Sequence, residues 1–179
     1  MKVSILIDSS SLMLTYSAGL LSDVIRWYEV LIPTSVYEEI TVPDKPGAEY
    51  FQDLKKEGNL QILNSPAGLH LVKEEYKAEL LKMGQGERDI MIHVLTGRGS
   101  FAVVDDLLAA RFCVKCDIPF INALLLPKIL HLAGVISLDE FRSSLSNLEN
   151  RGRYSNGILA RAKSFTAIDL EQFFPPKNI

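Results

Sequence analysis

The sequence predicts an α/β protein, a three-layer α/β/α sandwich with a mainly parallel central sheet. Two observations predict this fold class. Short apolar segments of strand character alternate with segments of helical character along nearly the whole chain. This order favours a parallel sheet with helices on both faces. The chain also contains no internal repeat or low-complexity tract that would indicate a different architecture.

Five short apolar segments are predicted to be the strands of this sheet. The first, from Val3 to Ile7, leads directly into Asp8. The second stops at Pro33, which has no N–H to donate to a neighbouring strand. The predicted strands are residues 3–7, 28–32, 60–63, 101–104 and 119–121.

Capping residues and glycines set the ends of the predicted helices. Asp8 and the three serines after it are residue types that begin helices, and Gly19 breaks the helix that they open. The loop 84–86, Gly-Gln-Gly, opens another helix, and Asp105-Asp106 opens a third. The predicted helices are residues 9–16, 20–27, 34–40, 48–57, 71–83, 87–95, 107–116, 124–133, 138–148 and 158–164, followed by a tail at 173–179.

The composition excludes several classes of protein. Hydrophobic residues make up 47% of the 179 residues and charged residues 23%, so the chain can bury enough apolar surface to offset its ordering entropy. Two cysteines cannot build a disulfide scaffold, and no apolar run reaches the ~20 residues of a membrane span. The first residues lead straight into a strand, unlike a signal peptide. We therefore expect a cytoplasmic protein with no membrane partner.

Charge is distributed unevenly along the chain. The formal net charge of −3 excludes a strongly basic nucleic-acid coat. Residues 141–165 nevertheless hold five Lys and Arg residues and one acid, Glu149. We therefore predict a main domain at residues 1–149 and a basic C-terminal helical extension and tail at residues 150–179.

Several carboxylates follow predicted strands. Asp8 comes at the end of the first strand, and Asp105 and Asp106 come at the end of the fourth. In open parallel sheets, binding sites form beyond the carboxyl ends of the strands. Acids from four segments could therefore meet at one edge of the sheet. The remaining candidates are Glu87 and Asp89 in the first turn of a helix, and Glu38 and Glu39 in the helix after Pro33.

Each acid also has a purely structural interpretation. Asp8 and Asp105 are good helix caps, and acids in a first turn suit the helix dipole. The expected convergence of several of these acids favours a functional interpretation, because like charges at short range are costly unless a cation neutralises them. Carboxylates without His or Cys nearby suit Mg²⁺ or Mn²⁺ better than Zn²⁺.

Four segments, in order, resemble the motifs of PIN-domain proteins, among them the toxin ribonucleases of toxin–antitoxin pairs. They are residues 5–10, 32–40, 84–90 and 103–111, and the resemblance spans about residues 3–135. It implies a PIN-like α/β/α fold and a metal-dependent endoribonuclease with Mg²⁺ or Mn²⁺ as cofactor and RNA as substrate. An antitoxin protein is an implied partner, although a protein of this kind can equally act in RNA processing.

The resemblance also assigns roles to individual residues. The fourth acid is Asp105 or Asp106, and the threonine–any–aspartate order of the family selects Asp106, with Val104 in place of the threonine. Arg88 and Arg111 are candidates for contacts with the RNA backbone. The implied catalytic residues are Asp8, Glu39, Glu87 and Asp106, the implied metal ligands are Asp8, Glu87, Asp105 and Asp106, and the supporting residues are Ser10 and Asp89.

Other interpretations stay open on the sequence alone. One is a PIN-like RNA-binding module that has lost turnover. Another is an acidic-pocket α/β domain unrelated to nucleic acid, such as a small phosphatase. The apolar segment 124–130 predicts either burial or homodimerisation. Phe141 and Tyr154 are candidates for the surface of a partner or a homodimer.

Overall fold

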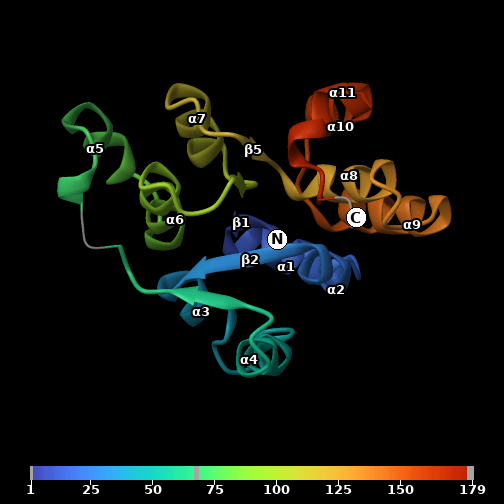
Figure 1. The fold of residues 1–179 in the computed structure, drawn as a ribbon, viewed down its shortest axis with the longest axis horizontal. Coiled ribbons are helices and arrows are strands. Elements are labelled where there is room, and N and C mark those ends of the chain that lie inside the picture. Colours follow the sequence, from blue (N-terminus) through green and yellow to red (C-terminus); the bar gives the residue numbers. More distant parts are fainter. Residues whose placement is uncertain (1, 67–68, 177–179) are drawn as a thin grey trace.

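The computed structural model describes residues 2–66 and 69–176, which form a parallel sheet of five strands flanked by helices (Figure 1). The strands lie in the order β3-β2-β1-β4-β5, and each neighbouring pair is parallel. Each strand lies on a predicted one, and the predicted fold class is confirmed. The strands are β1 (Val3–Ile7), β2 (Tyr28–Pro33), β3 (Gln61–Leu63), β4 (Phe101–Val103) and β5 (Phe120–Ile121).

Helices cover both faces of the sheet. Crossovers between parallel strands are right-handed. The connections from β1 to β2 and from β2 to β3 therefore lie on one face of the sheet, and those from β3 to β4 and from β4 to β5 lie on the other. In Figure 1, α5, α6 and α7 lie above β2 and β3, and α4 lies below them. The helices are α1 (Ser9–Ser17), α2 (Leu21–Trp27), α3 (Thr34–Ile40), α4 (Ala48–Lys56), α5 (Glu74–Leu80), α6 (Gln85–Leu95) and α7 (Leu107–Lys115), with a 3-10 turn, η1 (Leu69–Leu71), before α5.

The C-terminal part of the chain packs into the same core. The ring of Phe173 meets that of Phe101 edge-on, with 5.0 Å between centroids, and the Tyr28 hydroxyl donates to the Phe173 carbonyl at 2.6 Å. The predicted boundary after residue 149 falls within α9. The elements of this part are η2 (Ala123–Leu125), α8 (Leu126–Leu132), α9 (Leu138–Arg151), α10 (Asn156–Ser164), α11 (Ala167–Leu170) and η3 (Glu171–Phe173).

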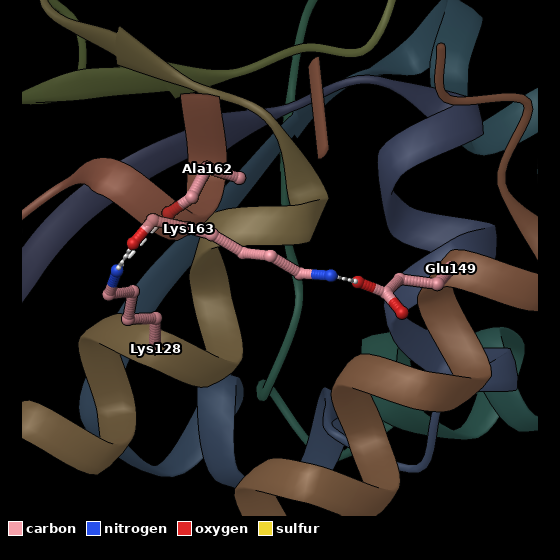
Figure 2. Close-up of polar contacts among 4 residues, drawn as sticks. All are labelled: Lys128, Glu149, Ala162 and Lys163. Carbon is pink, nitrogen blue, oxygen red and sulfur yellow. Dashed lines mark hydrogen bonds and ion pairs between the residues drawn. The ribbon is translucent and has the colours of Figure 1, made fainter. Parts of the chain in front are cut away.

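Two lysines fix α10 to its neighbours (Figure 2). Lys128 on α8 donates to the carbonyls of Ala162 and Lys163 at 3.2 and 2.9 Å. Lys163 forms an ion pair with Glu149 on α9 at 3.1 Å. The last carbonyls of a helix have no partner within it, and Lys128 supplies one from outside. The end of α10 is thus tied to both α8 and α9.

The apolar segment 124–130 is buried within the chain. Leu124, Leu126 and Leu130 have 1%, 0% and 0% of their surface exposed, which confirms the prediction of burial. The ring of Phe141 stacks on that of His131, with 5.2 Å between centroids. Among the described helices, none is long and apolar enough to cross a bilayer.

Two predicted helices differ from the structure in more than their ends, and one observed helix is not among the predictions. The predicted helix 71–83 is helical only in α5, which begins with two acids that its N-terminal dipole stabilises. The predicted helix 124–133 is divided, because α8 begins beside Pro127, whose missing N–H suits a first helical turn. The sequence patterns did not predict α11, although Thr166 and Asp169 form a capping box there. The last three residues of the predicted tail lie outside the described residues.

Candidate active site

The acids gather where the strand order of the sheet changes direction. From β1 the chain proceeds to β2 and β3 on one side, whereas β4 and β5 lie on the other. Such a switch point opens a crevice at the carboxyl ends of the strands. Ile7 at the end of β1 is paired in register with Val103 at the end of β4. Asp8 and Asp105 therefore leave the sheet side by side.

Asp8 is a buried carboxylate at the start of α1. Only 2% of its surface is exposed, and its two oxygens accept from different backbone groups. The Ser11 N–H donates to Oδ1 at 2.6 Å and caps α1, and the Asp105 N–H donates to Oδ2 at 3.1 Å. Burial raises the pKa of Asp8 to about 7, with a further contribution from the charge of Asp105, although the bonds from Ser11 oppose the increase. Its negative charge is thus destabilised in the absence of a cation.

Asp105 is held by three donors from three parts of the chain. The Ser11 hydroxyl donates to Oδ2 at 2.7 Å, and the Ala123 N–H donates to the same oxygen at 3.3 Å. The Tyr154 hydroxyl donates to Oδ1 at 2.8 Å. Burial raises the pKa of Asp105, and these three bonds oppose the increase. Burial and the charge of Asp105 in turn raise the pKa of Tyr154, so its hydroxyl remains a donor.

Glu87 and Asp106 form a second, more accessible group of acids. The Asp106 Oδ1 caps α7 by accepting from the N–H groups of Leu108 and Ala109 at 2.7 and 3.0 Å. Glu87 Oε2 accepts from the Gly84 N–H at 2.9 Å at the start of α6. Burial raises the pKa of Glu87, and the charges of Asp106 and then Glu39 add to the increase. These acids therefore cap helices, as their structural interpretation predicts, and their charges also repel one another.

Glu39 on α3 faces this second group from the other side. Its side chain is 52% exposed and lies 3.9 Å from the Lys45 ammonium. The loop before α6 approaches α3 closely, since a Cβ at Gly86 would lie 3.0 Å from Val36 Cγ2 and 4.0 Å from Glu39 Oε2. A glycine at this position is therefore what lets the two acidic helices meet.

The two predicted supporting residues lie outside these groups. Asp89 is buried and accepts from the Ser35 hydroxyl at 2.6 Å, which ties α6 to α3. Ser10 is exposed, and the serine hydroxyl that contacts the acids belongs to Ser11. Ser11 lies three residues after Asp8, the spacing at which a capping side chain meets a backbone N–H, so the sequence carried a signal for it. Tyr154 lies 49 residues from Asp105, and no local pattern indicates it.

A groove leads from the acids toward the C-terminal helices. It has a volume of about 450 Å³, and its lining is mainly apolar. Its lining includes Asp105 and Asp106 together with Arg161 and Phe165 of the basic C-terminal part. Of the two arginines predicted from the motifs, Arg88 is half-buried on α6 and Arg111 is exposed on α7.

The donor chemistry of the site fits a hard divalent cation. Its acids supply carboxylate oxygens only, the donors that Mg²⁺ and Mn²⁺ prefer. In the described part of the chain, no basic side chain forms an ion pair with Asp8, Glu87, Asp105 or Asp106. Within these same residues, however, no three Asp, Glu, His or Cys side chains lie close enough to hold a metal ion. Binding therefore requires side-chain rotation, for which the less buried Glu87 and Asp106 have more room than Asp8.

Its parallel sheet and flanking helices place this chain among the open α/β proteins. In that class, ligands bind beyond the carboxyl ends of the strands at the switch point, where the acids of this chain lie. A family model, DUF3368, described as a PIN domain, matches residues 4–164. The chain belongs to the PIN-domain family, whose members are generally nucleases, and the predicted resemblance is confirmed. No curated protein and no solved structure matches the chain at a significant level.

Proposed function

We propose that this chain is a metal-dependent endoribonuclease that hydrolyses RNA phosphodiester bonds. The observation that carries the proposal is the pair of carboxylates at the switch point of the sheet, the buried Asp8 and the half-buried Asp105. Burial disfavours the charge of each, and no basic side chain of the described residues pairs with either. Such an arrangement costs stability unless it serves to bind a cation.

The residues proposed to hold a divalent ion are Asp8, Glu87, Asp105 and Asp106. When bound, Mg²⁺ or Mn²⁺ supplies a water of lowered pKa and neutralises charge on the phosphate. Ser11 keeps Asp8 and Asp105 in a fixed relation by donating to both. Glu39, the most exposed of the acids, is suited to accept a proton from water at the edge of the site.

The groove beside the acids is proposed to take the RNA strand. Its apolar walls suit the faces of unstacked bases, and Arg161 provides a cation for a phosphate. Arg88 and Arg111 are proposed as further backbone contacts, because both lie within a few residues of an acid. These cations are needed because the acids themselves repel RNA.

The proposal is tested with a fluorophore-labelled single-stranded RNA, incubated with protein in Mg²⁺ or Mn²⁺ and with protein in a chelator. We expect cleavage only with the metal, and a loss of the order of 100-fold or more for Asp8→Asn. Glu38 and Glu39 are exposed neighbours on α3 and provide a matched pair. Glu39→Gln should reduce the rate, and Glu38→Gln should not. Equal cleavage by wild type and Asp8→Asn would exclude this site.

A second candidate function is a PIN-like module that binds RNA without turnover. The observation in its favour is that the acids of the described residues do not converge on a metal position. This candidate predicts a different result in the assays. The wild type would shift RNA in a gel-shift assay but would cleave none in either Mg²⁺ or Mn²⁺.

The biological setting of the nuclease is also a proposal. A toxin of a toxin–antitoxin pair should arrest growth when induced alone and should be neutralised by an antitoxin protein. A cytoplasmic RNA-processing nuclease should instead leave growth unchanged and alter specific transcripts. A homodimer is proposed as well, and sedimentation equilibrium of the purified chain measures it.

A further inference from the structure

We propose that Tyr154 is a positioning residue of the nuclease site, so that the C-terminal part of the chain completes the site. This inference rests on the proposed function, because it concerns how the acids of that site are held. The tyrosine lies between α9 and α10, outside the segments that carry the sequence motifs. The sequence predicts Tyr154 as a candidate for a partner surface, whereas in the structure its hydroxyl binds the carboxylate of Asp105 within the chain.

The hydrogen bonds of Asp105 show what Tyr154 contributes. Both of the other donors, the Ser11 hydroxyl and the Ala123 N–H, bind Oδ2. Tyr154 binds Oδ1 at 2.8 Å. Rotation about the Cβ–Cγ bond moves both oxygens, so a donor at Oδ1 adds a second restraint on this rotation to the restraint at Oδ2. Tyr154 therefore helps to hold the plane of the Asp105 carboxylate from the side that the other two donors leave free.

The effect of Tyr154 extends through Asp105 to Asp8. The Asp105 N–H donates to Asp8 Oδ2 at 3.1 Å. Ser11 donates through its N–H to Asp8 and through its hydroxyl to Asp105. One connected network thus runs from Tyr154 through Asp105 and Ser11 to Asp8, the most buried of the acids. Members of such networks act together, so removal of one donor affects the others.

Tyr154 is itself held in place by the packing of the segment around it. Gly152, where α9 ends, lies so close that a Cβ there would overlap the Tyr154 ring. The far end of α10 is tied down by Lys128 (Figure 2). A tyrosine held between the end of α9 and the tied-down α10 can position a carboxylate, which a freely rotating surface side chain cannot.

The test compares two variants that each remove one hydrogen-bonded tyrosine hydroxyl. Tyr154→Phe loses the bond to Asp105, and the matched control Tyr28→Phe loses the bond to the Phe173 carbonyl. Two quantities are measured for each, the cleavage rate with kcat and KM resolved, and the Mn²⁺ concentration that gives half of the metal-induced rise in melting temperature. The second needs no RNA and no turnover.

We expect Tyr154→Phe to lower kcat about 10- to 100-fold and to raise the half-saturating Mn²⁺ concentration about 10-fold, as loss of a residue that orients a metal ligand does. The KM for RNA should change by no more than about twofold, because the hydroxyl is not proposed to touch RNA. Tyr28→Phe should keep wild-type values of all three, although it melts at a lower temperature. Gly152→Ala, which displaces the ring but keeps the hydroxyl, should reproduce the defects of Tyr154→Phe.

The outcomes separate this inference from the proposed function. If the wild type cleaves RNA and Tyr154→Phe matches Tyr28→Phe in kcat and Mn²⁺ response, the positioning role is wrong and the nuclease stands. A Tyr154→Phe variant that is faster than the wild type also overturns it, because the hydroxyl would then block the site. If the wild type gains no stability from Mn²⁺ and cleaves nothing, both proposals fail.

Discussion

Replacing Asp8 by asparagine should stabilise the fold at neutral and higher pH, by an amount that depends on pH in a defined way. Burial raises the pKa of Asp8 from its ordinary 3.8 to about 7. An acid whose pKa is higher in the folded than in the unfolded chain favours folding at low pH. That stability is lost as the pH rises from the unfolded toward the folded pKa. Above pH 7 the full cost of the ionised Asp8 is about 4 kcal/mol, at about 1.4 kcal/mol per pKa unit.

Asparagine removes this cost but loses part of the hydrogen bonding. The Ser11 and Asp105 N–H groups both donate to Asp8, and an amide offers one of them an NH₂ group that cannot accept. That mismatch costs about 1–3 kcal/mol. Asp8→Asn should therefore be more stable than the wild type by about 1–3 kcal/mol at about pH 8. This advantage of the variant should fall by about 3 kcal/mol between about pH 8 and about pH 5, where the Asp8 side chain of the folded wild type is protonated. At about pH 5 the wild type should therefore be as stable as the variant or more stable.

Urea unfolding of both proteins in a chelator at the two pH values measures these free energies. The chelator matters because a divalent ion at the proposed site would stabilise the wild type more than the variant that lacks the Asp8 carboxylate. The subtraction of the two proteins cancels the titration of groups such as His93. A stability difference that stays constant between the two pH values, or that falls as the pH rises, would refute the buried, uncompensated charge on which the proposed function depends.

Three further predictions concern other parts of the molecule. Glu87→Gln should keep the Gly84 cap and nearly wild-type stability while cleavage falls by the order of 100-fold, as measured in the RNA assay. Gly47→Ala should lower the free energy of unfolding in urea by about 1–3 kcal/mol, since Gly47 has a φ of +82° and a Cβ there would lie 2.7 Å from Tyr16; an unchanged midpoint would contradict this backbone. Phe173→Ala should cost about 3–5 kcal/mol if the C-terminal part shares the core, and a loss below about 1 kcal/mol would indicate a separate tail.

The strands of the sheet could be predicted from the sequence because each strand is specified by residues that lie next to one another in the chain. An aliphatic run such as Ile5 to Ile7, followed at once by the helix cap Asp8, specifies a strand, its end and the next helix within a few residues. Helix ends were harder, because several residue types compete at each one. Pro127 divides one predicted helix, and the capping box at Thr166 begins a four-residue helix that is too short to show a helical pattern of apolar residues.

The candidate site could be predicted only in part. The strand-end acids Asp8, Asp105 and Asp106 are indicated by their positions, since parallel strands end at one edge. Nothing local indicates which of two adjacent aspartates turns inward, and the structure gives Asp105 the buried network and Asp106 the helix cap and the neighbouring Glu87. The contact of Tyr154 with Asp105 depends on the tertiary packing of α9 and α10, which no short pattern encodes.

The central claim is that acids from separate segments bind a divalent ion at the carboxyl edge of the sheet. A crystal of the wild type grown or soaked in Mn²⁺, with an anomalous difference map, tests it most directly. We predict one or two manganese peaks in contact with Asp8 and Glu87 and with at least one of Asp105 and Asp106. A map without manganese at these acids, from protein that cleaves RNA in the same solution, would contradict it.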